Sequence, residues 1–210
     1  MKFKTSQTLL ENSHSPSFVC PSCELKKNFS SVVVSRGNPF ANLMIIGEAP
    51  GAMEEKLGQP FVGRSGKLLD KLLNHVGIDS QNDVYFCNVI KSRPPKNRRP
   101  TRKEIEVNLP WLTEQIYLID PHLLILVGAT AVQSVLGNKN PISRIRGTWQ
   151  NWEGRLVMPL FHPSYLLRNP SKQLGAPLSL TLSDLFKVSN KLSKFKEHSD
   201  DGSRSEIKSG

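Results

Sequence analysis

Two carboxylates, a histidine and an amide lie near the ends of apolar runs in this chain of 210 residues. Glu48 and Glu54 follow one apolar run. Asn88 lies near the carboxyl end of a second run, and His162 follows a third. A carboxylate can stabilise a cation or orient water, a histidine can donate to a developing anion, and an amide offers a donor beside an acceptor. Each residue also has a structural interpretation, as a buried hydrogen bond or as part of a solvated loop.

Glycines surround two of the candidate positions. Gly47 and Gly51 enclose Glu48 in the sequence GEAPG, which predicts a tight loop where a ligand can approach backbone N–H groups. An ordinary strand-to-helix turn is the alternative. Residues 58–65 (GQPFVGRS) nearly match a phosphate-binding P-loop, but no buried strand precedes them. We therefore interpret this segment as a loop that presents Phe61 to a planar ligand, with a place in the core as the alternative.

Basic residues are concentrated at residues 91–103, where seven of thirteen side chains are lysine or arginine and none is acidic. Three prolines in this stretch exclude a regular helix, so an extended loop is expected. The chain has 28 basic and 18 acidic residues, and this net charge of +10 favours a polyanionic partner. Such a loop can follow a phosphate backbone, and a merely solvated loop is the alternative. The residues predicted to contact a phosphate backbone are Lys91, Arg93, Lys96, Arg98, Arg99 and Arg146.

Four apolar runs alternate with helical patterns along the chain. The predicted strands are residues 43–46, 84–90, 123–127 and 156–161, and the predicted helices are residues 68–76, 101–120, 129–136 and 178–196. Buried strands that alternate with helices indicate a parallel sheet covered on both faces. Ligands bind at the carboxyl ends of the strands in such sheets. We therefore expect the candidate residues to meet at one rim of the molecule.

A single α/β domain is predicted for residues 18–196. The flanking residues 1–17 and 197–210 are polar, and we expect them to be disordered. No apolar run reaches the roughly 20 residues that span a membrane, and the first residues lack the apolar core of a signal peptide. The three cysteines make an odd count, which does not suggest a disulfide framework. The protein is expected to be a cytoplasmic monomer, associated with the nucleoid when it is bound to DNA.

Three segments together resemble a known family. The sequences GEAPGAMEEKLGQPFVG, NVIKSRPPKNRRP and FHPSYLLR are similar to the signature regions of family 4 uracil-DNA glycosylases, a pattern shared with proteins related to a phage DNA polymerase. The resemblance implies a three-layer α/β/α sandwich around a four-stranded parallel sheet. It also implies a monofunctional hydrolase of base excision repair, which cuts the bond between a flipped-out uracil and its deoxyribose and leaves an abasic site.

The same resemblance implies roles for individual residues. Phe61 would stack on uracil, Asn88 would read its polar edge, and His162 would lie near O2. The implied catalytic residues are Glu48, Glu54 and His162, and the implied substrate-binding residues are Gly47, Phe61, Asn88 and Ser164. The expected partner is uracil-containing single- or double-stranded DNA. A non-catalytic DNA-binding or replication accessory protein, or an enzyme for another base lesion, remains an alternative.

The sequence differs from the family at the positions that hold an iron–sulfur cluster. The family holds a 4Fe–4S cluster with four cysteines, and Cys20 and Cys23 match the first two. Ser92 and Asn108 stand where the other two belong, and neither residue type is a usual cluster ligand. We therefore expect no cofactor and a remnant site at the cysteine pair. A cluster as in the family is the alternative.

Overall fold

The computed structural model describes residues 32–204, with side chains described as far as residue 195. The N-terminal segment of residues 1–17, the pair Cys20 and Cys23, and residues 205–210 lie outside the described residues. The predicted domain boundaries therefore stay predictions. No helix in the described range is both long and apolar enough to cross a membrane.

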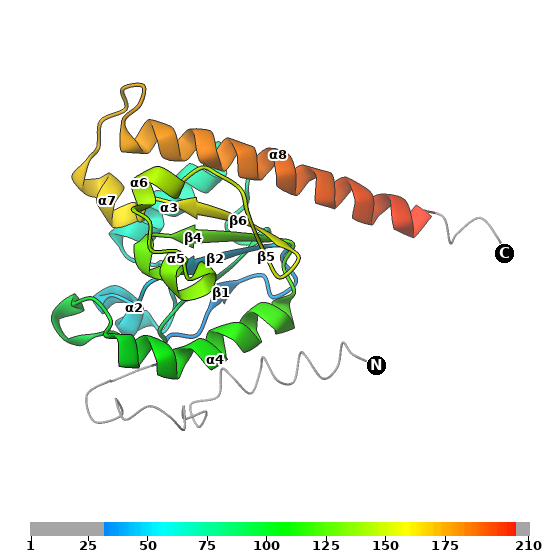
Figure 1. The fold of residues 1–210 in the computed structure, drawn as a ribbon. Helices are drawn as coiled ribbons and strands as arrows, with labels where there is room; N and C mark the ends of the chain where they lie inside the picture. The colour runs from blue at the N-terminus through cyan, green and yellow to red at the C-terminus, as the bar shows by residue number, and fades with distance from the viewer. Residues whose placement is uncertain (1–31, 205–210) are drawn as a thin grey trace.

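Within residues 32–204, six strands form one sheet (Figure 1). Their order is β1-β3-β2-β4-β6-β5. The strands are β1 (Arg36–Gly37), β2 (Leu43–Gly47), β3 (Val84–Asn88), β4 (Leu123–Val127), β5 (Gln150–Trp152) and β6 (Arg155–Leu160). The four central strands are parallel, as predicted. The short strands β1 and β5 pair antiparallel with the edges. The apolar pattern did not predict these two, because both are short and neither contains a fully buried residue.

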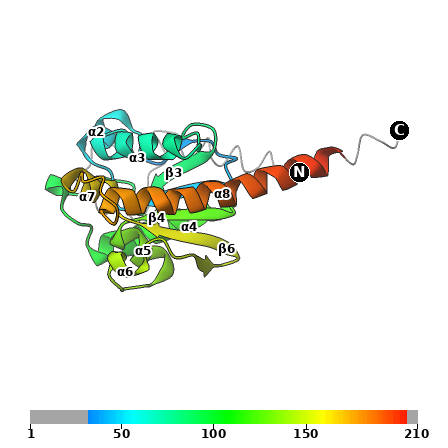
Figure 2. The ribbon, with the colours of Figure 1, turned by 90° about the horizontal axis from the view of Figure 1, so that it is seen from above.

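Helices lie between the strands along the chain and follow the last one. They are α2 (Ala52–Leu57), α3 (Arg64–His75), the 3₁₀ helix η2 (Pro95–Asn97), α4 (Arg102–Ile119), α5 (Ala129–Leu136), α6 (Ile142–Ile145), α7 (Pro163–Arg168) and α8 (Pro177–Arg204). The predicted capping box is present at α4, where Thr101 and Glu104 each accept the other's backbone N–H. Helix α8 continues past its predicted end near residue 196 and runs over the sheet and beyond the strands (Figure 2).

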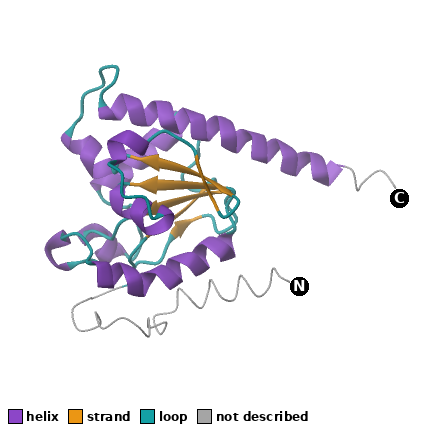
Figure 3. Ribbon diagram, in the orientation of Figure 1, coloured by secondary structure: helices purple, strands orange, loops and turns teal. Residues whose placement is uncertain are grey.

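Two hydrophobic clusters fill the two faces of the sheet. Side chains alternate along each strand, so in β4 Ile125 faces one side and Leu126 the other. The first face packs against α3 and α8, through residues such as Leu69 and Leu185. The second packs against α4 and α5, through residues such as Leu112. The sheet therefore lies between two layers of helices (Figure 3), which confirms the predicted α/β/α sandwich.

The strand order creates a crevice at the carboxyl ends of β2 and β4. The chain leaves β2 through α3, on the first face, to reach β3 on one side. It then returns through α4, on the second face, to reach β4 on the other side of β2. The two connections lie on opposite faces of the sheet, so they leave a crevice between the carboxyl ends of β2 and β4. Doubly wound proteins bind ligands at such a crevice.

Candidate active site

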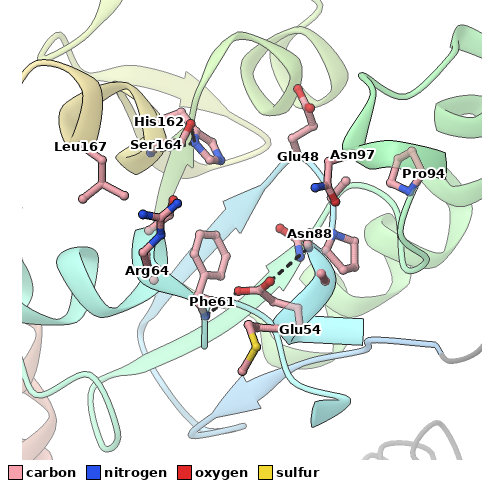
Figure 4. A pocket seen from close by; sticks show the side chains of 18 of the residues that line it. Glu48, Glu54, Phe61, Arg64, Asn88, Pro94, Asn97, His162, Ser164 and Leu167 are labelled. Atoms are coloured by element: carbon pink, nitrogen blue, oxygen red, sulfur yellow. Dashed lines mark hydrogen bonds between the residues drawn. The ribbon is translucent and has the colours of Figure 1, made fainter. Parts of the chain in front are cut away.

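A cleft of about 810 Å³ opens at this end of the sheet (Figure 4). Its walls include Glu48, Glu54, Phe61, Asn88 and His162, which come from four separate parts of the chain. Ser164 also lines the cleft. The structure therefore brings together the acidic, aromatic, amide and histidine side chains that the sequence singled out.

Gly47 ends β2 beneath the cleft. It is the register partner of Asn88 across the pair of strands β2 and β3. A Cβ atom at Gly47 would lie 2.6 Å from Cζ of Phe61 and closer still to Oδ1 of Asn88. Both side chains thus rest against bare backbone. Any other residue at position 47 would displace the aromatic ring, the amide or both.

Phe61 lies on a glycine-framed turn, the Phe61 loop (residues 58–63). Its φ of 57° is in the left-handed region, which costs energy for a residue with a side chain. Its ring packs on Phe86 of β3 at 5.6 Å between centroids. A Cβ atom at Gly66, in the first turn of α3, would overlap the carbonyl of Phe61. The loop is therefore held against the start of α3, with the ring in the cleft (Figure 4).

Glu54 ties two loops together. One carboxylate oxygen accepts the backbone N–H of Gly51 at 3.1 Å, and the other accepts that of Gly63 at 2.7 Å. The first contact belongs to the loop after β2, and the second belongs to the Phe61 loop. Both carboxylate oxygens are engaged in holding backbone, so this geometry favours a positioning role over a chemical one.

Glu48 crosses the crevice between β2 and β4. Its carboxylate accepts a hydrogen bond from the hydroxyl of Thr130, which lies in the first turn of α5 directly after β4. Thr130 is buried, and Arg99 donates to its hydroxyl at 3.4 Å. The sequence analysis did not single out Thr130, because nothing in the chain order connects it with Glu48.

His162 is the N-cap of α7, and its Nδ1 accepts the backbone N–H of Ser164 at 3.1 Å. The hydroxyl of Ser164 lies 2.8 Å from the same nitrogen. A backbone N–H only donates, so Nδ1 carries no hydrogen and the neutral ring carries its hydrogen on Nε2. Burial lowers the pKa of His162 below its usual value, although the charge of Glu48 acts in the opposite direction. At neutral pH the ring is therefore an uncharged donor.

Comparison with known proteins agrees with this geometry. Residues 34–186 match the uracil-DNA glycosylase superfamily. The chain belongs to this superfamily. A type-4 uracil-DNA glycosylase of Thermotoga maritima is 43% identical over 177 residues, covering 83% of this chain and 90% of the relative. The corresponding protein of Saccharolobus solfataricus is 40% identical over 159 residues, or 72% and 74% of the two chains. The family predicted from the signature segments is confirmed.

A phage protein also matches this glycosylase domain. The DNA polymerase of Bacillus phage SP01 is 33% identical over 138 residues, which cover 66% of this chain and 15% of the polymerase. The sequence analysis expected a pattern shared with proteins related to a phage DNA polymerase, and this match agrees with that expectation.

Lys91, predicted to contact DNA, lies in the interior of the protein. Its side chain is 1% exposed, and its ammonium donates to the carbonyl of Asn88 at 2.7 Å and to the side-chain oxygen of Gln115. Burial lowers the pKa of Lys91. The prediction that Lys91 contacts DNA is wrong, because an ammonium enclosed in this way cannot reach a phosphate. It binds the backbone of the residue predicted to read the base.

Other predicted DNA contacts are bound to carboxylates of the protein. Arg93 pairs with Glu55 at 3.0 Å. Arg98 forms two hydrogen bonds with Glu104, at 2.6 and 2.7 Å, and these lower the pKa of Glu104 to about 2. Arg93 is therefore half-buried, and Arg98 stays partly exposed on the cleft wall.

The remaining predicted contacts divide into two kinds. Lys96 and Arg99 are exposed. Arg146 instead binds both carboxylate oxygens of Asp184, a residue of α8 that is fully buried. The DNA contact of Arg146 stays a prediction, although moving the guanidinium away to a phosphate would leave the buried carboxylate of Asp184 without its partner.

The sequence analysis missed several residues that line the cleft. They include Met53, Arg64, Ser65, Asn97, Leu167 and Arg168. Leu167 and Arg168 belong to the segment FHPSYLLR, so the motif contained a signal. In a short apolar stretch, however, the sequence does not reveal that Leu166 is buried while Leu167 is 42% exposed at the cleft.

The family resemblance implies an iron–sulfur cluster, and the residues that the structure describes do not fit one. Asn108 is buried, and its amide oxygen accepts the N–H of Lys91 at 3.1 Å while its amide nitrogen donates to the carbonyl of Glu104 at 2.8 Å. Ser92 is buried as well. Neither position supplies the thiolate that such a cluster needs. Within the described range, Cys87 is the free cysteine, and it is buried in β3.

Proposed function

We propose that this chain is a monofunctional uracil-DNA glycosylase that hydrolyses the bond between N1 of a flipped-out uracil and C1′ of its deoxyribose. The names of its type-4 relatives support the activity. The observation that carries it is the arrangement of Phe61, Asn88, Glu48 and His162 around one cleft above Gly47. A protein that only binds DNA has no need of this set.

Uracil recognition rests on the cleft floor. Phe61 offers its ring for stacking, and the carboxamide of Asn88 pairs with O4 and N3–H of uracil. Cytosine reverses the donor and the acceptor at these two positions, so one orientation of the amide rejects it. Gly47 brings both side chains to the base, because it places no atom between them.

Bond cleavage leaves positive charge on the sugar and negative charge on the base. Glu48, oriented by Thr130, is the carboxylate that stabilises the sugar cation or orients the attacking water. His162 donates from Nε2 to O2 of the departing uracil, and Ser164 fixes the ring for this purpose. Glu54, predicted as catalytic, acts through the two loops that it holds.

DNA binding uses the exposed basic residues Lys96 and Arg99, with partly exposed Arg98 beside the cleft. Leu167, apolar and exposed at the cleft, fills the space that the flipped nucleotide leaves in the base stack. The protein acts as a monomer on single- or double-stranded DNA, in the cytoplasm and at the nucleoid.

The proposal includes folding and activity without a 4Fe–4S cluster. It is supported by the two hydrogen bonds that the Asn108 amide makes at one ligand position. Iron and sulfide analysis of protein purified without oxygen tests it. The expected result is no stoichiometric iron and no broad visible absorption band. Near-stoichiometric iron would overturn this part and leave the assignment of the glycosylase intact.

The decisive experiment is incubation with single- and double-stranded oligonucleotides that contain one uracil, followed by alkaline cleavage. Release of free uracil and strand cleavage only after alkali are expected, without added metal or nucleotide. Glu48→Gln tests whether the reaction belongs to this cleft. If excess enzyme leaves the uracil in place while DNA binding is retained, the protein is an accessory on the same fold.

A further inference from the structure

Arg36 has a largely buried side chain, and the proposed chemistry does not use its contacts. It lies in the edge strand β1, and its side chain is only 7% exposed. Its Nε donates to the carbonyl of Pro60 at 2.8 Å, and its Nη2 donates to the carbonyl of Phe61 at 3.3 Å. The same Nη2 pairs with Asp70 of α3 at 2.7 Å. One guanidinium thus joins the sheet edge, the Phe61 loop and α3.

The carbonyls that Arg36 binds belong to a turn that is difficult to hold. Phe61 has a left-handed backbone, which relaxes to an ordinary conformation unless its surroundings fix it. Glu54 anchors the far end of the loop at the N–H of Gly63. Arg36 anchors the middle, at the strained residue itself. The two side chains therefore hold the turn from both sides.

Arg36 also contacts the ring on which Phe61 rests. It is the register partner of Phe86 across β1 and β3, and its guanidinium carbon lies 3.8 Å from the centre of that ring. Phe86 in turn packs on Phe61. The backbone and the ring of Phe61 thus have one common support, which a guanidinium can give because it combines a flat face with a fork of donors.

We propose that Arg36 is a positioning residue for uracil recognition, which fixes the stacking surface of Phe61 in the cleft. This inference rests on the proposed function of the cleft. It concerns the affinity for the base, and it leaves the chemistry of Glu48 and His162 unchanged.

Arg36→Met tests the proposal, with Arg155→Met as a matched control. Arg155 is similarly buried, pairs with Asp120, donates to a backbone carbonyl and faces the ring of Tyr117, but it lies at the amino end of β6, away from the cleft. The measurements are inhibition by free uracil, single-turnover cleavage and binding to uracil-free DNA, all made well below the melting temperature of each variant. The assay of the unaltered protein tests the proposed function separately.

For Arg36→Met we expect the inhibition constant for free uracil to rise roughly 10-fold or more, the scale of a displaced binding group. Cleavage should slow at low substrate concentration, with affinity for uracil-free DNA unchanged. Arg155→Met should keep the uracil affinity of the unaltered protein, whatever it loses in stability. Equal uracil inhibition of the two variants would overturn the proposal.

Two milder variants keep the proposal open to test if Arg36→Met does not fold. Arg36→Lys retains the positive charge and should bind uracil with intermediate affinity, because an ammonium cannot span both carbonyls and the ring. Asp70→Asn leaves the guanidinium in place and removes one partner, so its effect should be smaller. Unaltered uracil inhibition of Arg36→Lys, in a variant as stable as the parent, would contradict the positioning role.

Discussion

The Phe61 loop and the basic loop (residues 91–103) were both expected to contact a ligand, but their side chains are placed differently in the structure. In the Phe61 loop, the aromatic residue lies in the cleft, and a side chain at Gly63 would collide with the carboxylate of Glu54. Gly47 and Gly66, outside the loop, likewise lie where a side chain would collide with Phe61. In the basic loop, Lys91 is buried, and three arginines (Arg93, Arg98 and Arg102) are paired with carboxylates of the protein itself.

The difference shows which sequence features determine a position in space. Glycine is the residue that tolerates a left-handed backbone or the close approach of another side chain, so the positions of glycines around an aromatic residue carry geometric information. A positive charge is satisfied equally by a phosphate or by a carboxylate. Glu55, which binds Arg93, lies far from it in the sequence. The number of charges in the basic loop therefore predicted the partner better than it predicted the contacts.

The largest effect is expected from Gly47→Ala. The added methyl group would push Phe61 and Asn88 apart, and a displacement of this kind costs at least about 10²-fold in the single-turnover cleavage rate. Gly137→Ala is the control, because it strains a helix end where nothing lies within 4 Å. That variant should lose stability and keep its rate. A fully active Gly47→Ala variant would show that Phe61 and Asn88 do not both need to contact the base.

His162→Ala should slow cleavage by about 10²-fold, the scale of losing one donor to a developing anion. DNA affinity should hardly change. The rate of the unaltered protein should be flat from pH 8 to about 6.5, because the lowered pKa keeps the ring neutral. It should fall in more acidic solution, because a proton on Nδ1 removes the acceptor for the Ser164 N–H that orients the ring. A rate that rises as the pH falls would indicate a charged histidine instead.

The salt dependence of DNA affinity distinguishes the exposed basic residues of the basic loop from those that are paired with carboxylates. Changing Lys96 and Arg99 together to glutamine should flatten the plot of log affinity against log salt by about 1.8 units, if each contacts one phosphate. Changing Arg93 and Arg98 together should alter the slope by less than about one unit, because both already hold carboxylates. Equal slopes for the two double variants would mean that the ion pairs open when DNA binds.

The smallest effect concerns acid stability. The folded-state pKa of Glu104, about 2, lies below its ordinary value of 4.5, so its contribution to stability is present above pH 4.5 and is lost as the pH falls toward 2. Glu104→Gln keeps the capping acceptor and removes the charge. The melting temperature of this variant should therefore fall less between pH 5 and pH 2.5 than that of the parent. Parallel curves would show that the Arg98 pair contributes little.

The sequence predicted the elements that depend on local pattern and missed those that depend on distant neighbours. The four parallel strands and α4 follow from apolar runs and a capping box, and both were found. Strands β1 and β5 have no apolar pattern of their own, because they only extend edges that other strands create. No pattern of this kind was available for them.

The candidate site divides in the same way. Glu48, Phe61, Asn88 and His162 were predicted from motifs, and they meet in one cleft. Arg36 and Thr130 act on these residues from other strands and helices, so only the folded chain reveals them. Lys91 is the opposite case, a residue whose type gave a wrong prediction. A lysine is expected at the surface, but its partners Asn88 and Gln115 hold it in the interior.

The bare backbone at Gly47 also constrains how this protein can evolve. Phe61 and Asn88 both occupy the volume that any side chain at position 47 would need, so the three positions are epistatic. A mutation toward a different base preference at one of them is harmful until a second mutation compensates for it. Selection acting on single substitutions therefore keeps these three positions as they are.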